Sequence, residues 1–254
     1  FLNSEDTDEG AGINDQAELS RMEGVLQKRL RRELLINGVQ IPHPQSVYLE
    51  PGVTVAGGAR LLPGTTLAGR TSVASSAVIG PDTYVVDSRI GSNARIWYSV
   101  VESSDVGENV SVGPFAHIRP KSRIEKNARV GNFVEIKSSR LGRYARALHL
   151  SYVGDAVVGE DANIGAGTIT CNYDGYKKYP TRIGSKAFIG SNTALVAPVS
   201  VGAGAVVGAG SAITKNVPAD SLSMTRAPQV VIKGWAKRKR AAMAGVAKKT
   251  GRKA

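Results

Sequence analysis

The stretch LGRYARALHLSYVGDAVVGEDANIG, residues 141–165, decides the fold because it carries one short motif repeatedly. In each copy an aliphatic residue is followed by glycine, as in Leu141-Gly142 and Val158-Gly159, with a small residue a few positions later. The motif is a hexad, and it recurs from about residue 53 to residue 213. Recurrence at a fixed period indicates a repetitive fold in which each unit packs on its neighbours.

The hexads group into threes. The motif positions Ile90, Val106, Ile124, Leu141 and Val158 follow one another at steps of 16, 18, 17 and 17 residues. Three short strands per coil make a triangular prism whose aliphatic residues point inward and stack from coil to coil. We therefore predict an all-β fold, a left-handed parallel β-helix of hexapeptide repeats, over residues 41–229.

Other segments flank the repeats. Residues 1–12 are acidic and read as a linker. Residues 13–40 predict a connector helix, because Leu19, Met22, Leu26 and Leu30 recur at three- and four-residue steps and Asn37-Gly38 supplies a stop. Residues 230–254 read as a flexible basic C-terminal tail.

Composition limits the class of protein. The chain has 254 residues, 42% of them hydrophobic but only 6% aromatic, and 29 are glycine, which suits a core of small and branched aliphatic side chains. The single cysteine, Cys171, cannot form an internal disulfide, and no apolar run approaches the length of a membrane span. We expect a cytoplasmic protein with no membrane partner.

The formal charge of +12 is unevenly distributed. Nine basic residues and no acidic residue lie from Lys233 onward, so the rest of the chain is nearly balanced. Trp235 is the only aromatic residue among these charges, whereas many nucleic-acid-binding surfaces interleave several aromatic residues with basic ones. We expect a solvated tail and no nucleic-acid partner.

One coil carries an insertion. The step from Val158 to Ile183 is 25 residues, about seven more than one coil needs, and the excess lies in the polar, aromatic segment 171–179. Loops that leave a rigid scaffold often carry function, although a tolerated insertion is the alternative.

Residues one coil apart should lie above one another. Arg119 and Lys137 differ by 18 positions, so two cations should stack, and a bound anion such as phosphate would relieve their repulsion. The alternative is that both simply face water. Glu135 shares a strand face with Lys137, and Tyr152 lies 17 positions further on, so all four can form one polar patch.

His149 lies three positions before Tyr152, between Leu148 and Leu150. A histidine oriented by a carboxylate can accept a proton near neutral pH, and Glu135 is the candidate carboxylate. The alternative is a structural histidine packed between two leucines. A zinc site of three histidines is disfavoured, because His43, His117 and His149 lack the spacing for it.

Three runs of sequence resemble one family. They are 131–137 (GNFVEIK), 149–155 (HLSYVGD) and 164–175 (IGAGTITCNYDG). In this order they resemble the acetyltransferase domain of the bacterial bifunctional N-acetylglucosamine-1-phosphate uridyltransferase / glucosamine-1-phosphate acetyltransferase, over roughly residues 12–235. The resemblance implies acetyl transfer from acetyl-CoA to the amine of glucosamine-1-phosphate, a step toward UDP-N-acetylglucosamine and peptidoglycan precursors. The uridyltransferase half is absent from this chain.

The resemblance also implies roles and an assembly. Arg119 and Lys137 would bind the sugar phosphate, and His149, oriented by Glu135, would be the general base. The remaining positions sort into sugar contacts and acetyl-CoA contacts: Tyr152, Asn163 and Asn172 for the sugar; Ala166, Asn172, Tyr173, Ser191, Ala209 and Arg226 for the cofactor. The resemblance implies a homotrimer with sites between subunits, and no metal for acetyl transfer.

A non-catalytic reading remains open, in which the domain is a trimerising scaffold for an upstream nucleotidyltransferase. Fold alone does not exclude it. Such a scaffold has no need of the Arg119–Lys137 or Glu135–His149 arrangements.

Overall fold

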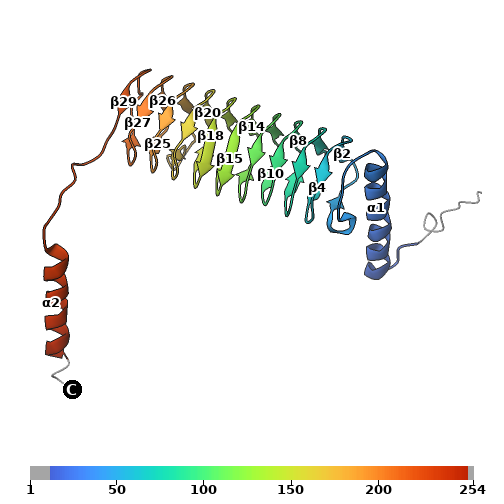
Figure 1. The fold of residues 1–254 in the computed structure, drawn as a ribbon, viewed down its shortest axis with the longest axis horizontal. Coiled ribbons are helices and arrows are strands. Elements are labelled where there is room, and N and C mark those ends of the chain that lie inside the picture. The colour runs from blue at the N-terminus through green and yellow to red at the C-terminus, as the bar shows by residue number, and fades with distance from the viewer. Residues whose placement is uncertain (1–11, 251–254) are drawn as a thin grey trace, which may run out of the picture.

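The computed structural model describes the backbone of residues 12–250 and the side chains of residues 12–243. The body is a long prism of stacked coils, with one helix against the first coil and a second helix beyond the last (Figure 1). Of the predicted linker, residues 1–12, only Gly12 lies within the described residues. No described helix is both long enough and apolar enough to cross a membrane.

Each coil contributes one short strand to each of three parallel sheets. The first sheet contains β1 (Tyr48–Leu49), β4 (Thr66–Ala68), β7 (Tyr84–Val86), β10 (Val100–Glu102), β13 (His117–Ile118), β16 (Glu135–Lys137), β19 (Tyr152–Gly154), β22 (Ile169–Cys171), β25 (Ala194–Val196) and β28 (Ala212–Ile213). The second sheet contains β2 (Thr54–Val55), β5 (Ser72–Val73), β8 (Arg89–Ile90), β11 (Asp105–Val106), β14 (Arg123–Ile124), β17 (Arg140–Leu141), β20 (Ala156–Val158), β23 (Thr181–Ile183) and β26 (Val199–Val201). The third sheet contains β3 (Arg60–Leu61), β6 (Val78–Ile79), β9 (Arg95–Ile96), β12 (Ser111–Val112), β15 (Arg129–Asn132), β18 (Arg146–His149), β21 (Asn163–Ile164), β24 (Phe188–Ile189), β27 (Val206–Val207) and β29 (Leu222–Ser223). The predicted left-handed parallel β-helix is confirmed.

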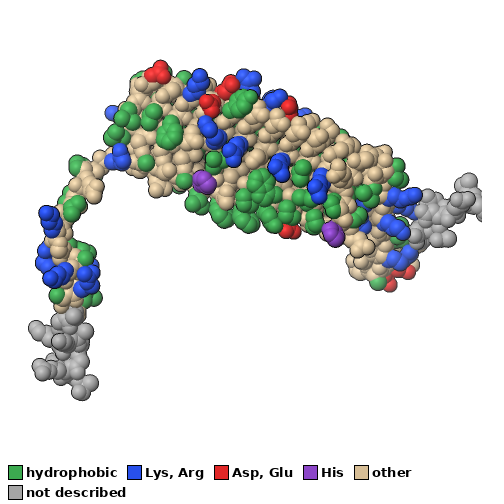
Figure 2. Space-filling view, in the orientation of Figure 1, with side chains coloured by type: hydrophobic (Ala, Val, Ile, Leu, Met, Phe, Trp, Pro, Cys, Tyr) green, Lys and Arg blue, Asp and Glu red, His purple; other side chains and the backbone are tan. Residues whose placement is uncertain are grey.

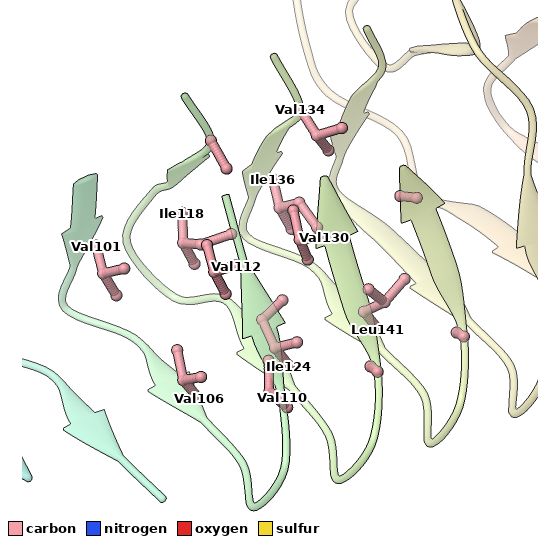
Figure 3. Packing of buried hydrophobic residues seen from close by; sticks show 14 of the residues in the cluster. Val101, Val106, Val110, Val112, Ile118, Ile124, Val130, Val134, Ile136 and Leu141 are labelled. Atoms are coloured by element: carbon pink, nitrogen blue, oxygen red, sulfur yellow. The ribbon is translucent and has the colours of Figure 1, made fainter. Parts of the chain in front are cut away.

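The core is a stack of aliphatic side chains inside the prism. On the first sheet Val101, Ile118 and Ile136 occupy the same place in successive coils, and none is exposed to solvent (Figure 3). Because neighbouring strands lie about 4.8 Å apart, each side chain packs on the one above and the one below. The hexad's aliphatic positions therefore form one continuous core cluster.

Helix α1 (Gln16–Ile36) lies within the segment where a helix was predicted, and its Leu30 and Leu34 pack against the core of the prism. Asp15 caps its N-terminus by accepting a hydrogen bond from the backbone N–H of Glu18 at 2.8 Å. The buried amide of Gln27 donates to the carbonyl of Leu49 at 2.6 Å and accepts from the Leu49 N–H at 3.0 Å. This side chain satisfies groups that a preceding coil would otherwise bind. A 3-10 turn, η1 (Pro44–Ser46), leads into β1.

The C-terminal segment contains a helix that the sequence analysis did not predict. Helix α2 (Trp235–Thr250) lies within the basic tail and projects away from the body (Figure 1). The Lys239 ammonium lies 4.8 Å from the centroid of the Trp235 ring. Lys, Arg and Ala are strong helix formers, and they make up most of this segment.

Left-handed residues turn the chain at the corners of the prism. At the corner between the third and first sheets, Phe115, Phe133 and Leu150 have φ values of 58°, 55° and 46°. Consequently His149, which ends β18, lies on the third sheet, whereas Tyr152, which begins β19, lies on the first. The two residues are close in sequence but belong to different faces.

Candidate active site

The outer face of the first sheet carries two columns of polar residues. His117, Glu135 and Tyr152 pair in register on successive strands and form one column. Arg119 follows β13, and its backbone N–H donates to the carbonyl of Ile136, so it lies beside Lys137 in the second column. The predicted stacking of Arg119 and Lys137 is therefore present, with Glu135 and Tyr152 beside them.

Arg119 is held by a carboxylate on the next coil. Its Nη1 donates to Oε1 of Glu135 at 2.6 Å, and both side chains are 38% exposed. This hydrogen bond is the main reason that the pKa of Arg119 is raised above its usual value. A guanidinium group has five N–H donors, so the contact leaves donors available for a second anion.

Lys137 has a cationic neighbour that the sequence analysis missed. The ammonium group of Lys178, which comes from the inserted segment, lowers the pKa of Lys137, and loss of hydration and the charge of Arg119 act in the same direction. The face thus brings together three cations, and their mutual repulsion favours an anion among them.

The inserted segment is a small ordered hairpin. The Tyr179 N–H donates to the carbonyl of Asn172 at 2.9 Å, and Tyr173 and Lys178 form an antiparallel bridge. Asp174 Oδ1 accepts hydrogen bonds of 2.8 Å from the N–H groups of Tyr176 and Lys177, which lowers the pKa of the Asp174 carboxyl. The hairpin, residues 172–179, therefore presents Lys178 back toward the first sheet.

Two of the predicted site residues belong to this hairpin: Asn172 lies at its base and Tyr173 follows it. The buried side chain of Asn172 hydrogen-bonds with Asp155 and lies 3.4 Å from the hydroxyl of Tyr152. Tyr173 is 59% exposed, and its hydroxyl donates to the carbonyl of Gly175 at 2.6 Å. Asn172 thus joins the polar face of the first sheet, while the Tyr173 ring faces solvent.

The expected hydrogen bond between Glu135 and His149 is not formed. Glu135 faces outward from the first sheet and contacts Arg119, whereas His149 ends a strand of the third sheet, across the corner at Leu150. The His149 side chain is exposed, and within the described residues its ring has no hydrogen-bond partner. Leu150 is 64% exposed, so His149 is not a core histidine packed between leucines.

His149 begins a column of predicted cofactor residues. It pairs with Asn132, and the register of β18 with β21 places Ala166 next to it on the following coil. The Asn192 N–H donates to Ala166, and the Gly210 N–H donates to Ser191, so Ser191 and then Ala209 continue the line. Because these side chains are small, little side-chain bulk projects from this corner, which leaves room for a long, narrow ligand.

Arg226 and Asn163 lie beside the same column. The Arg226 side chain lies against Gly208 and Gly210, on either side of Ala209. Asn163, in β21, is half-buried on the third sheet and pairs in register with Arg146 and Phe188. The predicted site residues therefore form two groups, a cationic group on the first sheet and a line of small residues at the corner of the third.

Two further residues on the cationic face were not predicted as site residues. Nε2 of His117 lies 2.8 Å from Oε2 of Glu102. A histidine–carboxylate pair therefore exists on this face, but it involves neither His149 nor Glu135. Glu102 and His117 are 15 residues apart, close to the 16 residues between Arg119 and Glu135. This spacing of about one coil could have predicted the contact. Among the described residues no group of three or more His, Cys, Asp or Glu side chains is arranged to hold a metal ion.

A surface groove lies on another face of the prism, away from these residues. A shallow groove of about 870 Å³ runs over the second sheet and is lined by alternating charges. These charges already pair from coil to coil, as in Arg89 with Asp105 at 2.6 Å and Arg140 with Glu125 at 2.8 Å. The charges of the groove are therefore largely paired with one another, whereas Lys137 on the first sheet lies beside the like charge of Lys178.

Comparison with known proteins agrees with the repeat fold. A family model described as bacterial transferase hexapeptide (six repeats) matches residues 103–138, and one described as hexapeptide repeat of succinyl-transferase matches residues 180–215. Among solved structures, LpxA from Acinetobacter baumannii is 15% identical with a TM-score of 0.43, covering 79% of this chain and 77% of that one. A mutant of perosamine N-acetyltransferase from Caulobacter crescentus, solved in complex with CoA and GDP-perosamine, is 22% identical with a TM-score of 0.41, covering 46% and 53%.

Sequence relatives are much closer. The bifunctional protein GlmU of Thermosipho africanus is 48% identical over 239 residues, which cover 94% of this chain and 53% of the relative. The GlmU proteins of Fervidobacterium nodosum and Streptococcus mutans are each 45% identical, covering 93% and 92% of this chain and 52% and 51% of theirs. The chain spans about half the length of these relatives. Over nearly its whole length, this chain is therefore similar to about half of the bifunctional GlmU protein.

Proposed function

We propose that this chain transfers the acetyl group of acetyl-CoA to the amine of glucosamine-1-phosphate. The observation that carries the proposal is the pairing of two features: three cations on the first sheet, and a low corner that begins at an exposed histidine. The relationship to GlmU proteins supports the choice of an acyl donor and an amino-sugar phosphate.

The cationic face is the proposed binding site for the sugar phosphate. Arg119 retains unused N–H donors beside Glu135, and Lys137 and Lys178 add two ammonium groups. Charge-assisted hydrogen bonds to phosphate are stronger than neutral ones, and a guanidinium can bind phosphate through two donors at once. We assign the contacts with the sugar ring to Tyr152, Asn172 and Asn163.

The corner column is the proposed acetyl-CoA site. The small residues Ala166, Ser191 and Ala209 would line the extended arm of the cofactor, with the thioester toward His149 and Arg226 near the phosphates. Tyr173, exposed on the hairpin, is a proposed contact for the cofactor. Acetyl-CoA is a co-substrate, and no metal has a role in this step.

His149 is the proposed general base. The amine nitrogen attacks the thioester carbonyl, a C–N bond forms, the C–S bond breaks, and CoA leaves as the thiol. His149 takes the proton that the neutral amine loses as the C–N bond forms, and the protonated imidazole returns it to the departing sulfur, which gives the thiol. Glu135 belongs in this scheme as the residue that positions Arg119, and it makes no hydrogen bond with His149 of the same chain.

We infer that the working unit is a homotrimer. The first and third sheets of one chain face different directions, so a site that needs both groups is completed where two chains meet. Apolar side chains are exposed along one edge of the body (Figure 2). Tyr98, Phe115 and Phe133 stack along the corner next to Leu150, with ring centroids 5.8 and 5.4 Å apart, and exposed apolar surface of this kind marks protein interfaces.

Product analysis tests the proposed reaction. Incubation with acetyl-CoA and glucosamine-1-phosphate should give N-acetylglucosamine-1-phosphate by mass spectrometry. Glucose-1-phosphate, which has a hydroxyl where the substrate has its amine, should remain unmodified. An unmodified amino sugar in the presence of folded trimer would favour the scaffold alternative instead.

A further inference from the structure

Two carboxylate pairs cross the first sheet diagonally, side by side. Glu135 contacts Arg119 at 2.6 Å, and Glu102 contacts His117 at 2.8 Å. Val100 pairs with His117 and Val101 with Ile118, so the next step of this register places Glu102 beside Arg119. The carboxylate of Glu102 nevertheless turns sideways, toward the histidine.

This arrangement matters because Glu102 is a natural partner for Arg119. Oppositely charged residues directly across neighbouring strands attract one another. The charge of Glu102 already contributes, after that of Glu135, to the raised pKa of Arg119. If Glu102 swung onto the guanidinium, Arg119 would have two carboxylate partners, and an incoming phosphate would compete with both.

We propose that His117 is a positioning residue that keeps Glu102 away from Arg119. By holding the Glu102 carboxylate, His117 leaves guanidinium donors of Arg119 free for the phosphate of the substrate. The inference rests on the proposed function in that it takes a sugar phosphate as the ligand of this face. Its effect is on the binding of that ligand, and neither His117 nor Glu102 takes part in proton transfer.

A double-variant experiment tests the idea. The His117→Ala variant should bind glucosamine-1-phosphate about two- to fivefold more weakly, the range expected when a partly exposed carboxylate competes for the guanidinium. Replacing the competitor as well, in His117→Ala/Glu102→Gln, should restore parental affinity. The Glu102→Gln single variant should bind at least as tightly as the parent. Arg89→Ala, which breaks the ion pair with Asp105 on the second sheet, is the matched control and should leave affinity unchanged.

Two readouts keep the outcomes separate. Titration calorimetry with glucosamine-1-phosphate measures affinity without any acetyl transfer, and steady-state kinetics gives KM for the sugar phosphate and for acetyl-CoA. Rescue of binding in the double variant supports the inference even if the parent proves inactive, in which case only the proposed reaction fails. A double variant as weak as His117→Ala, or a His117→Ala variant as tight as the parent, overturns the inference.

Discussion

Arg119 and Glu135 lie on successive coils of the first sheet, and their side chains meet at 2.6 Å. The contact fixes the guanidinium on the face where Lys137 and Lys178 also gather. It also occupies Glu135, the carboxylate that the family resemblance implied as the partner of His149. The substrate-binding and proton-accepting parts of the proposed site thus lie on separate faces of one chain.

Removing either stacked cation should weaken phosphate binding selectively. We predict that Arg119→Ala and Lys137→Ala each raise KM for glucosamine-1-phosphate by roughly ten- to hundredfold, because each removes a charged hydrogen bond. KM for acetyl-CoA should change little. Steady-state kinetics with each substrate varied in turn measures both values. Arg123→Ala, on the outer face of the second sheet, is the control and should behave like the parent.

Lys178 should set the alkaline limit of phosphate binding. Lys137 carries its charge below its pKa and loses it as the pH rises through that value. Because Lys178 lowers the pKa of Lys137, affinity should fall at a lower pH than for an ordinary lysine. In Lys178→Ala the affinity near pH 8 should be weaker, but the alkaline fall should move to higher pH.

Binding of N-acetylglucosamine-1-phosphate between about pH 8 and pH 11 measures this shift, because this ligand has no free amine and its phosphate is fully ionised there, with a second pKa near 6. Lys177→Ala, at the neighbouring position whose ammonium lies over the Tyr179 ring, is the control. An alkaline midpoint that is the same in Lys178→Ala and in the parent would show that the two ammonium groups are not coupled.

Much of this architecture could be predicted from the hexads alone. Repeated aliphatic residues at three hexads per coil determine the core, and the long step between Val158 and Ile183 marks the hairpin. The family resemblance supplied Ala166, Ser191 and Ala209 as separate positions, and the backbone hydrogen bonds of the structure show that they are neighbours on successive coils.

The partner of Glu135 could not be predicted in the same way. The repeat period predicts which residues lie above one another on successive coils. It does not predict where the chain turns from one sheet to the next. Leu150 adopts a left-handed conformation, which bulky residues rarely do, and it turns the chain between His149 and Tyr152. The reach of Lys178 depends on turn hydrogen bonds to Asp174, which no hexad encodes.

Gln27 should stabilise the open end of the β-helix. Gln27→Ala removes two hydrogen bonds and leaves a donor and an acceptor of Leu49 without partners, each costing about 1–3 kcal/mol. We predict a thermal midpoint lower by roughly 5–15 °C. Thermal unfolding followed by circular dichroism measures it. Gln16→Ala, at an exposed position of the same helix, should change the midpoint by less than half as much; equal effects would mean that the Leu49 contacts add little.

The apolar corner should hold the trimer together. Phe133 is 58% exposed and stacks on Phe115, so Phe133→Glu should place a charge in the proposed interface. Sedimentation equilibrium should then give a monomer, with acetyl transfer lost. Tyr144→Glu alters another exposed aromatic residue with positive φ and should remain trimeric. A parent that is monomeric and fully active would remove the need for sites between chains.

The central claim is that His149 acts as the general base in acetyl transfer. Parallel measurement of free-thiol release from acetyl-CoA by the parent and by His149→Ala tests it most directly. The parent should release thiol only when glucosamine-1-phosphate is present. His149→Ala should keep its oligomeric state, melting temperature and KM for acetyl-CoA, because the side chain is exposed and its ring has no hydrogen-bond partner among the described residues. Its turnover should fall by about 10²–10⁴-fold, the usual contribution of a general base. A folded His149→Ala protein that releases thiol at the parental rate would contradict the account.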